Sequence, residues 1–234
     1  MKISHDSSVY VSRQVFYFLG VSARLRQLLE DPLTSDALRL PDIRESPDAR
    51  GGVCCNIWES RGWWERVVEG RGRNADSPPT DFGRENDGRN IVLAMNADGF
   101  QPWRRLNRTI TPFTCMILNL PENLRHQSRF IMIPGLIPGP RAPAQLNPYL
   151  TIIVEELKQL WTHGLQYTDP HTGQQRTVRV KLLMTCADYP AHGDLNMQQG
   201  AGATYGCIKC HVKVRKSRSS MMCDDYVMIH DFSS

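Results

Sequence analysis

The 234-residue chain has no run of about 18 apolar residues, the length that a helix needs to cross a membrane. Its first residues also lack the apolar stretch of a secretory signal. Both absences favour an intracellular protein with no membrane partner. The seven cysteines are an odd number in a chain of this size, which is typical of a reducing compartment and argues against a disulfide framework.

A strong charge of one sign is also absent. The formal net charge is +4 and the pI is about 8.7, so the chain permits a nucleic-acid partner but does not require one. Hydrophobic residues make up 41% of the sequence, which is enough for a core of substantial size.

Composition divides the chain into four segments. Residues 1–40 are aromatic and then helical, with leucines at helical spacing over 22–30 and Ser22 as a candidate N-cap. Residues 41–90 form an irregular linker rich in Arg, Gly and Pro. Three tryptophans interrupt this linker in the island 56–68, which we expect to dock on the main domain. Residues 91–211 carry the regular core, and residues 212–234 form a basic tail.

Apolar runs predict strands at 91–97, 115–120, 130–133 and 178–186, with a rigid proline-rich loop at 134–140. A helix is predicted between the third and fourth strands, with Asn147 as its N-cap, one apolar stripe and Gly164 as its terminator. The order is three strands, a helix and a strand that returns parallel beside the first. This is the order of a ribonuclease-H-like core, an α/β fold, here preceded by an irregular N-terminal extension.

Asp98 follows the first predicted strand of the core, and Asp188 follows the last. The simpler interpretation of Asp98-Gly99 is a turn after a buried strand. In a ribonuclease-H-like core, however, the two aspartates would meet at one sheet edge, where like charges need a cation between them. Hard oxygen ligands suit Mg²⁺ or Mn²⁺, and two ions roughly 3.5–4 Å apart can support phosphodiester chemistry.

Several motifs occur in the order and at the spacing of a known family. They include Asp98-Gly99-Phe100-Gln101-Pro102, Leu118-Asn119-Leu120-Pro121, the segment 135–140, Ala187-Asp188-Tyr189-Pro190-Ala191 and Cys207-Ile208-Lys209-Cys210. With these motifs the chain resembles the plant-type transposases of CACTA (En/Spm) elements from about residue 12 to about residue 213. The resemblance implies a DDE-type cut-and-paste transposase with Asp98 and Asp188 as its first two catalytic acids. It also implies Mg²⁺ or Mn²⁺ as cofactor, transposon ends as the DNA partner, an oligomer in the intact family and a nuclear location.

The chain departs from the family in its third acid. Only 24 residues follow Cys210, and Asp224 and Asp225 lie in a tail unlike the family, so neither is assigned that role. Asn56 also stands where the family has aspartate. We therefore expect a truncated copy that lacks the C-terminal part of the fold and is inactive alone. The alternatives are a non-catalytic DNA-binding or interaction remnant and a decayed copy without function.

The remaining candidates are thiols and cations. Cys207 and Cys210 supply two ligands towards a zinc site, or they are two buried thiols. Three arginines just past the first acid, Arg104, Arg105 and Arg108, are placed for contacts with DNA phosphates. The basic cluster 213–218 is either a solvated tail or a further contact with the DNA backbone.

Overall fold

A five-stranded mixed sheet organises the computed structural model, which describes residues 14–40, 56–68, 82, 88–102, 108–143, 145–187 and 195. The sheet has the order β1-β4-β3-β2-β7. Its strands are β1 (Tyr17–Phe18), β2 (Ile91–Ala97), β3 (Thr109–Ile117), β4 (Met132–Gly139) and β7 (Val180–Thr185). A separate hairpin pairs β5 (Leu165–Thr168) with β6 (Gln175–Val178).

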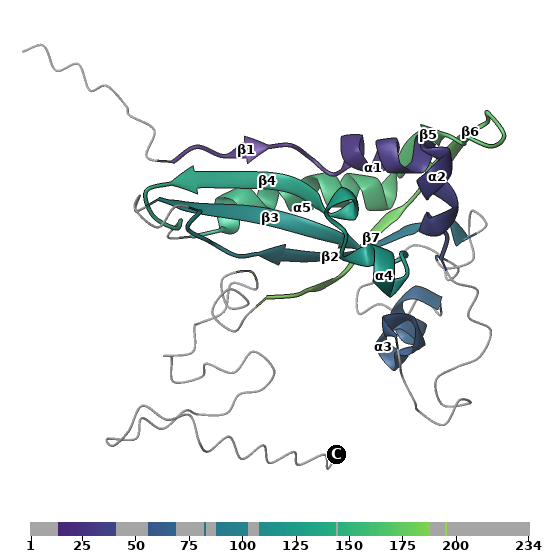
Figure 1. The fold of residues 1–234 in the computed structure, drawn as a ribbon, viewed down its shortest axis with the longest axis horizontal. Helices are drawn as coiled ribbons and strands as arrows, with labels where there is room; N and C mark the ends of the chain where they lie inside the picture. The colour runs from purple at the N-terminus through teal and green to yellow at the C-terminus, as the bar shows by residue number, and fades with distance from the viewer. Residues whose placement is uncertain are drawn as a thin grey trace, which may run out of the picture.

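The longest helix of the described residues, α5 (Asn147–Thr162), connects β4 to the hairpin β5–β6, which leads into β7. The pairs β1–β4, β4–β3 and β3–β2 are antiparallel, whereas β7 runs parallel to β2 (Figure 1). A parallel neighbour requires a crossover connection, which α5 supplies. The predicted order of three strands, a helix and a strand beside the first is therefore confirmed, and the fold is mixed α/β.

Side chains of β2 alternate between two apolar clusters, one on each face of the sheet. Ile91, Leu93 and Met95 enter the larger cluster, together with buried residues of α1 (Ser22–Glu30) and α5. Val92 and Ala94 enter the smaller cluster on the other face. Because both faces of the sheet are covered at β2, the sequence of this strand is a continuous apolar run instead of an alternation of apolar and polar residues.

The tryptophan island docks on the second face, as expected from the sequence. It forms η3 (Ile57–Glu59), α3 (Arg61–Trp63) and the π-helical turn η4 (Trp64–Val68). Trp63 is 2% exposed and packs in the smaller cluster. The indole N–H of Trp58 donates to the carbonyl oxygen of Leu118 at 2.5 Å, and the guanidinium of Arg125 lies 5.4 Å from the centroid of the Trp58 ring. These contacts give the aromatic side chains the burial that their size requires.

The predicted helix at 22–30 is confirmed as α1, but Ser22 is not its cap. The carboxylate of Glu156 on α5 accepts the backbone N–H groups of Val21 at 2.8 Å and Ser22 at 3.0 Å, and the Ser22 hydroxyl at 2.6 Å. A carboxylate at this position satisfies free N–H groups and complements the helix dipole. The chain continues through α2 (Pro32–Ser35) and η1 (Asp36–Leu38).

Residues 134–140 are not the loop that their prolines and glycines predicted, because β4 runs through them to Gly139. Neither Pro134 nor Pro138 can donate a backbone hydrogen bond, yet their carbonyl oxygens remain available. The Pro134 carbonyl accepts the N–H groups of Leu19 at 2.9 Å and Gly20 at 3.0 Å. Gly135 leaves room for Phe16, whose ring would lie 2.5 Å from a Cβ at that position.

Other predicted strands need smaller corrections. The second core strand begins at Thr109 and ends at Ile117, and short helical turns, α4 (Glu122–Arg125) and η6 (Ser128–Phe130), precede the third. The predicted strand 178–186 is the end of β6 followed by β7. The hairpin β5–β6 was not predicted.

Gly164 ends α5 as predicted and is expected to resist substitution. Its φ is +78°, and a Cβ there would lie 2.6 Å from Thr177 Cγ2 and 2.9 Å from the Val178 carbonyl oxygen. Gly164→Ala should lower the free energy of unfolding by about 2–3 kcal/mol, which combines left-handed strain with overpacking. Gly173→Ala is the control, because its φ is +69° with no atom within 4 Å, and it should cost about 1 kcal/mol. Equal losses in urea unfolding would contradict the packing argument.

Candidate functional site

Asp98 lies exposed at the end of β2, beside β3. Ala97 pairs with Phe113, and Phe100 exchanges backbone hydrogen bonds of 3.0 and 2.9 Å with Ile110. Both pairs keep the same register, so the chain does not turn sharply at Asp98-Gly99, and that expectation is wrong. The acid sits on an extended segment held at both ends by β3.

The register explains why β2 ends before the acid. It places Asp98 opposite Pro112, which has no N–H to donate across the ladder. It also places Gly99 opposite Thr111. A Cβ on Gly99 would lie 3.2 Å from Thr111 Oγ1 and 3.3 Å from Thr109 Cγ2, so the glycine after the acid allows a close approach of the two strands.

The face of β2 that carries Asp98 changes from apolar to polar towards the strand end. By the alternation of side chains, Val92, Ala94, Asn96 and Asp98 share this face. The first two are buried in the smaller cluster, whereas Asn96 has a buried Oδ1 with no hydrogen-bond partner among the described residues. Asn96 was not among the residues predicted from the sequence, although the period of two from Asp98 along a strand identifies it.

The end of β7 lies at the same sheet edge as the end of β2. Leu93 pairs with Leu182 and Ala94 pairs with Met184, so Leu183 is an extra residue in a β-bulge. Beyond the bulge, Met95 pairs with Thr185, and the N–H of Cys186 donates to the Met95 carbonyl oxygen at 2.8 Å. Bulges next to functional sites re-aim the side chains that follow them.

Two of the predicted site residues are described, and both are exposed: Asp98 and Arg108. The others lie outside the described residues: Asp188, Cys207, Cys210, Arg104 and Arg105. Within the described ranges no group of three or more His, Cys, Asp or Glu side chains could hold a metal ion. The assigned catalytic, metal and DNA-binding roles therefore stay predictions.

A second carboxylate, Asp169, stabilises the hairpin β5–β6. It is 0% exposed, with Arg176 Nε 2.7 Å and an Arg89 guanidinium nitrogen 3.6 Å from its Oδ2. The backbone N–H of His171 donates to its other oxygen at 3.0 Å. This hydrogen bond, with the two guanidinium groups, holds the pKa of Asp169 below its usual value. Its partners are within the protein, which argues for a structural ion cluster.

The described thiols include no candidate nucleophile in the core. Cys115 is 0% exposed on β3, and burial, with a further contribution from Glu156, raises its pKa to about 12. A thiol with that pKa stays protonated and unreactive at neutral pH. The exposed thiol is Cys186, immediately after β7.

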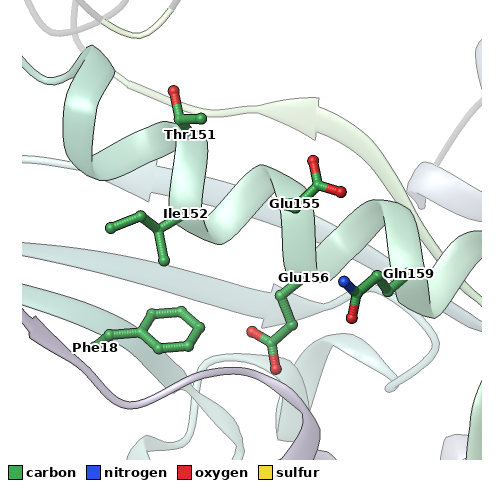
Figure 2. A pocket seen from close by; sticks show the side chains of 6 residues that line it. All are labelled: Phe18, Thr151, Ile152, Glu155, Glu156 and Gln159. Carbon is green, nitrogen blue, oxygen red and sulfur yellow. The ribbon is translucent and has the colours of Figure 1, made fainter.

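An open hollow of about 500 Å³ lies between Phe18 and one side of α5. Figure 2 shows its lining side chains, with the Glu156 carboxylate directed towards the chain that leads from β1 into α1. That carboxylate is already bonded to the start of α1, and the other lining carboxylate, Glu155, lies 3.7 Å from the Lys158 amine. Among the described residues that line the hollow, both carboxylates therefore already have a partner within the protein.

The sequence profile of the transposase family tnp2 matches residues 73–230, more than half of the chain. The chain belongs to this family. In this transposase-family chain, the match begins before β2 and extends past Cys210, so it includes Asp98, Asp188 and the Cys-x-x-Cys motif. No curated protein matches the chain significantly.

Membership in a transposase family gives the chain a transposase-related function and suggests DNA as its partner. Among the residues that the structure describes, no helix is long and apolar enough to cross a membrane.

Proposed function

We propose that the chain carries part of a DDE-type cut-and-paste transposase of the CACTA (En/Spm) kind, with a ribonuclease-H-like catalytic core. Membership in the tnp2 family supports a transposase, and the motifs shared with CACTA (En/Spm) transposases support the more specific assignment. The sheet supports the ribonuclease-H-like core, because β4, β3 and β2 form an antiparallel meander and β7 returns parallel to β2 after α5. Two acids at the ends of β2 and β7 would then serve the chemistry of strand cleavage and transfer.

The observation that carries the proposal is the register of β2 with β7. Met95 pairs with Thr185, and Asp98 and Asp188 each stand three residues further along the chain. We propose that Asp188 lies beside Asp98 at this edge, since three residues separate each acid from the paired positions Met95 and Thr185. Because of the bulge at Leu183, each acid lies the same number of residues beyond the pair Met95–Thr185. A ladder without the bulge would instead align Asp188 with Gly99.

Two described side chains at this edge, those of Asp98 and Asn96, could each contribute an oxygen ligand to a hard divalent cation. The Asp98 carboxylate is exposed, and no cation of the described residues contacts it. The Asn96 amide oxygen on the same face is also without a partner in that part of the chain. Oxygen ligands of this kind suit Mg²⁺ or Mn²⁺, and such an ion would stabilise charge on a phosphodiester and activate the attacking hydroxyl. Asp98 and Asp188 would hold the ion, and the rigid β2 would fix the position of Asp98.

Titration of the purified chain with Mn²⁺ tests the site. Asp98→Asn should weaken binding by at least about 10-fold, because affinity for hard cations follows the number of charged oxygen ligands. Asp36→Asn is the control, since Asp36 is exposed, lies 3.8 Å from Arg39 and follows α2, near the start of β2 and away from Asp98. Equal Mn²⁺ affinity in Asp98→Asn and the unaltered chain would refute the metal site.

A plasmid-nicking assay tests the expected inactivity. Because only two of the three catalytic acids are assigned, the 234-residue chain should leave supercoiled plasmid intact in the presence of Mg²⁺. Mg²⁺-dependent nicking that is lost in Asp98→Asn would overturn the inactivity and support the site at once.

Non-catalytic DNA binding is the second candidate function. Binding that survives Asp98→Asn and Asp188→Asn but weakens steeply with salt would favour it. We also propose that the protein acts in the nucleus and that the intact transposase is oligomeric. Zinc at Cys207 and Cys210 belongs to the same proposal, and mass spectrometry of the native chain would detect the bound ion.

A further inference from the structure

An exposed aromatic side chain lies two residues beyond Asp98. Phe100 is 51% exposed, and among the described residues no aromatic ring pairs with its ring and no cation lies over it. Its backbone is fixed, because Phe100 and Ile110 exchange hydrogen bonds of 3.0 and 2.9 Å. The ring is therefore held in solvent by a rigid part of the sheet, which lowers the entropy that binding costs.

The Phe100 ring and the Asp98 carboxylate lie on the same face of the sheet. The register with β3 is unbroken from Ala97 to Phe100, so alternate residues share a face. The residue between them confirms the alternation, because a Cβ on Gly99 would lie 3.2 Å from Thr111 Oγ1 on the opposite face. Phe100 and Asp98 are two residues apart, or about 7 Å along the strand.

The neighbouring strand extends the apolar surface beside the acid. The register places Pro112 opposite Asp98 and Ile110 opposite Phe100. Both residues of β3 are half-buried, and neither belongs to the two apolar clusters of the described residues. Asp98 is therefore bordered on one side by an apolar strip, formed by Phe100, Ile110 and Pro112, and on the other side by the end of β7.

We infer that Phe100 is a positioning residue that stacks on an unpaired DNA base next to the phosphodiester at Asp98. An aromatic ring accepts any base, because every base has a π-face. The separation of about 7 Å between Phe100 and Asp98 is comparable to the distance between the phosphate and the base of one nucleotide, so one nucleotide reaches both side chains. The base must first leave the duplex stack, because a stacked base does not expose its face. The inference rests on the proposed function, since it assumes that Asp98 serves a phosphodiester.

Fluorescence anisotropy with a labelled oligothymidine, at several salt concentrations, tests the stacking. Phe100→Leu should bind this single strand about 5- to 100-fold more weakly, which is the usual effect of losing one stacked base. The slope of log K against log salt should stay unchanged, because no phosphate contact is lost. Phe100→Trp should bind at least as tightly as the unaltered chain, because tryptophan keeps an aromatic face.

An abasic strand of the same length separates stacking from every other effect of the substitution. It keeps the phosphates and lacks the bases, so the unaltered chain and Phe100→Leu should bind it equally. Blunt duplex DNA should also be bound equally by the two proteins, because its bases are stacked on one another. Equal losses of Phe100→Leu on the oligothymidine and on the abasic strand would overturn the stacking.

Phe18→Leu is the matched control. Phe18 is 45% exposed, and its ring lies on the α5 side of the sheet, 6.3 Å from the Phe16 ring (Figure 2). This substitution on the face opposite Asp98 should leave single-strand binding unchanged. Binding that Phe18→Leu and Phe100→Leu reduce equally, or that neither reduces, would overturn the role of Phe100 and leave the proposed function standing. Absence of any DNA binding by the unaltered chain would overturn both.

Discussion

Replacing Trp63 with alanine is expected to lower the free energy of unfolding by about 3–5 kcal/mol. Trp63 is 2% exposed, and its ring packs with Val67, Phe82 and Val92 in the cluster beneath the Asp98 face of β2. Removing the ring creates a cavity that this short segment cannot fill, since η4 is only one π-helical turn. Urea unfolding followed by tryptophan fluorescence measures the loss.

Trp64→Ala is the control for this prediction. Trp64 follows Trp63 directly but is only partly buried and retains contacts of its own, so its loss should be less than half as large. A loss for Trp63→Ala no greater than that for Trp64→Ala would mean that the island does not support the sheet. In that case the face of β2 beneath Asp98 would have to be covered in another way.

Asn119→Ala is expected to lower the free energy of unfolding by about 3–6 kcal/mol, about 1–2 kcal/mol for each of three broken hydrogen bonds. The Asn119 side chain is 1% exposed and makes three bonds. Its Oδ1 accepts the Val92 N–H at 2.8 Å, and its Nδ2 donates to the carbonyl oxygens of Leu38 at 2.7 Å and Asn90 at 2.8 Å. Alanine would leave all three backbone groups buried without partners.

Asn123→Ala gives the comparison for Asn119. Asn123 is exposed in α4, and its change should stay within about 0.5 kcal/mol. Asn119→Asp keeps the acceptor but sets a carboxylate against two carbonyl oxygens, so it should be at least as unstable as Asn119→Ala. Thermal unfolding of the three variants decides the point, and near-native stability of Asn119→Asp would contradict the assigned bonds.

The sequence predicted the elements whose pattern is carried by their own residues. Strand 91–97 has the predicted bounds because its apolar run is bounded by Asn90 and Asp98, and α5 follows its apolar stripe from Asn147 to Thr162. It could not predict β4 through Pro134 and Pro138, because the acceptors of that strand serve segments far away in the chain. The cap on α1 could not be predicted for the same reason, since Glu156 belongs to another helix, α5.

The candidate site, too, could be predicted only in part from the sequence. Asp98 was predicted from its place after an apolar run and from family resemblance, and the structure adds its extended backbone and its neighbour Asn96. The bulge at Leu183 has no signal in the sequence, because Leu182, Leu183 and Met184 are all apolar. Asn119 lies in a motif that marks the family resemblance, but its three buried hydrogen bonds explain it as a structural residue.

The bond between Glu156 and the start of α1 also bears on how the protein folds during synthesis. Val21 and Glu156 are 135 residues apart, which a ribosome takes about 7–27 s to add at about 5–20 residues per second. During that interval Leu25, Leu28 and Leu29 have no core to enter, because their cluster also needs residues of α5. The apolar side of α1 therefore stays uncovered on the nascent chain until α5 has been made, and a ribosome-bound chain stalled before residue 156 should bind a chaperone more strongly than a chain stalled after β7.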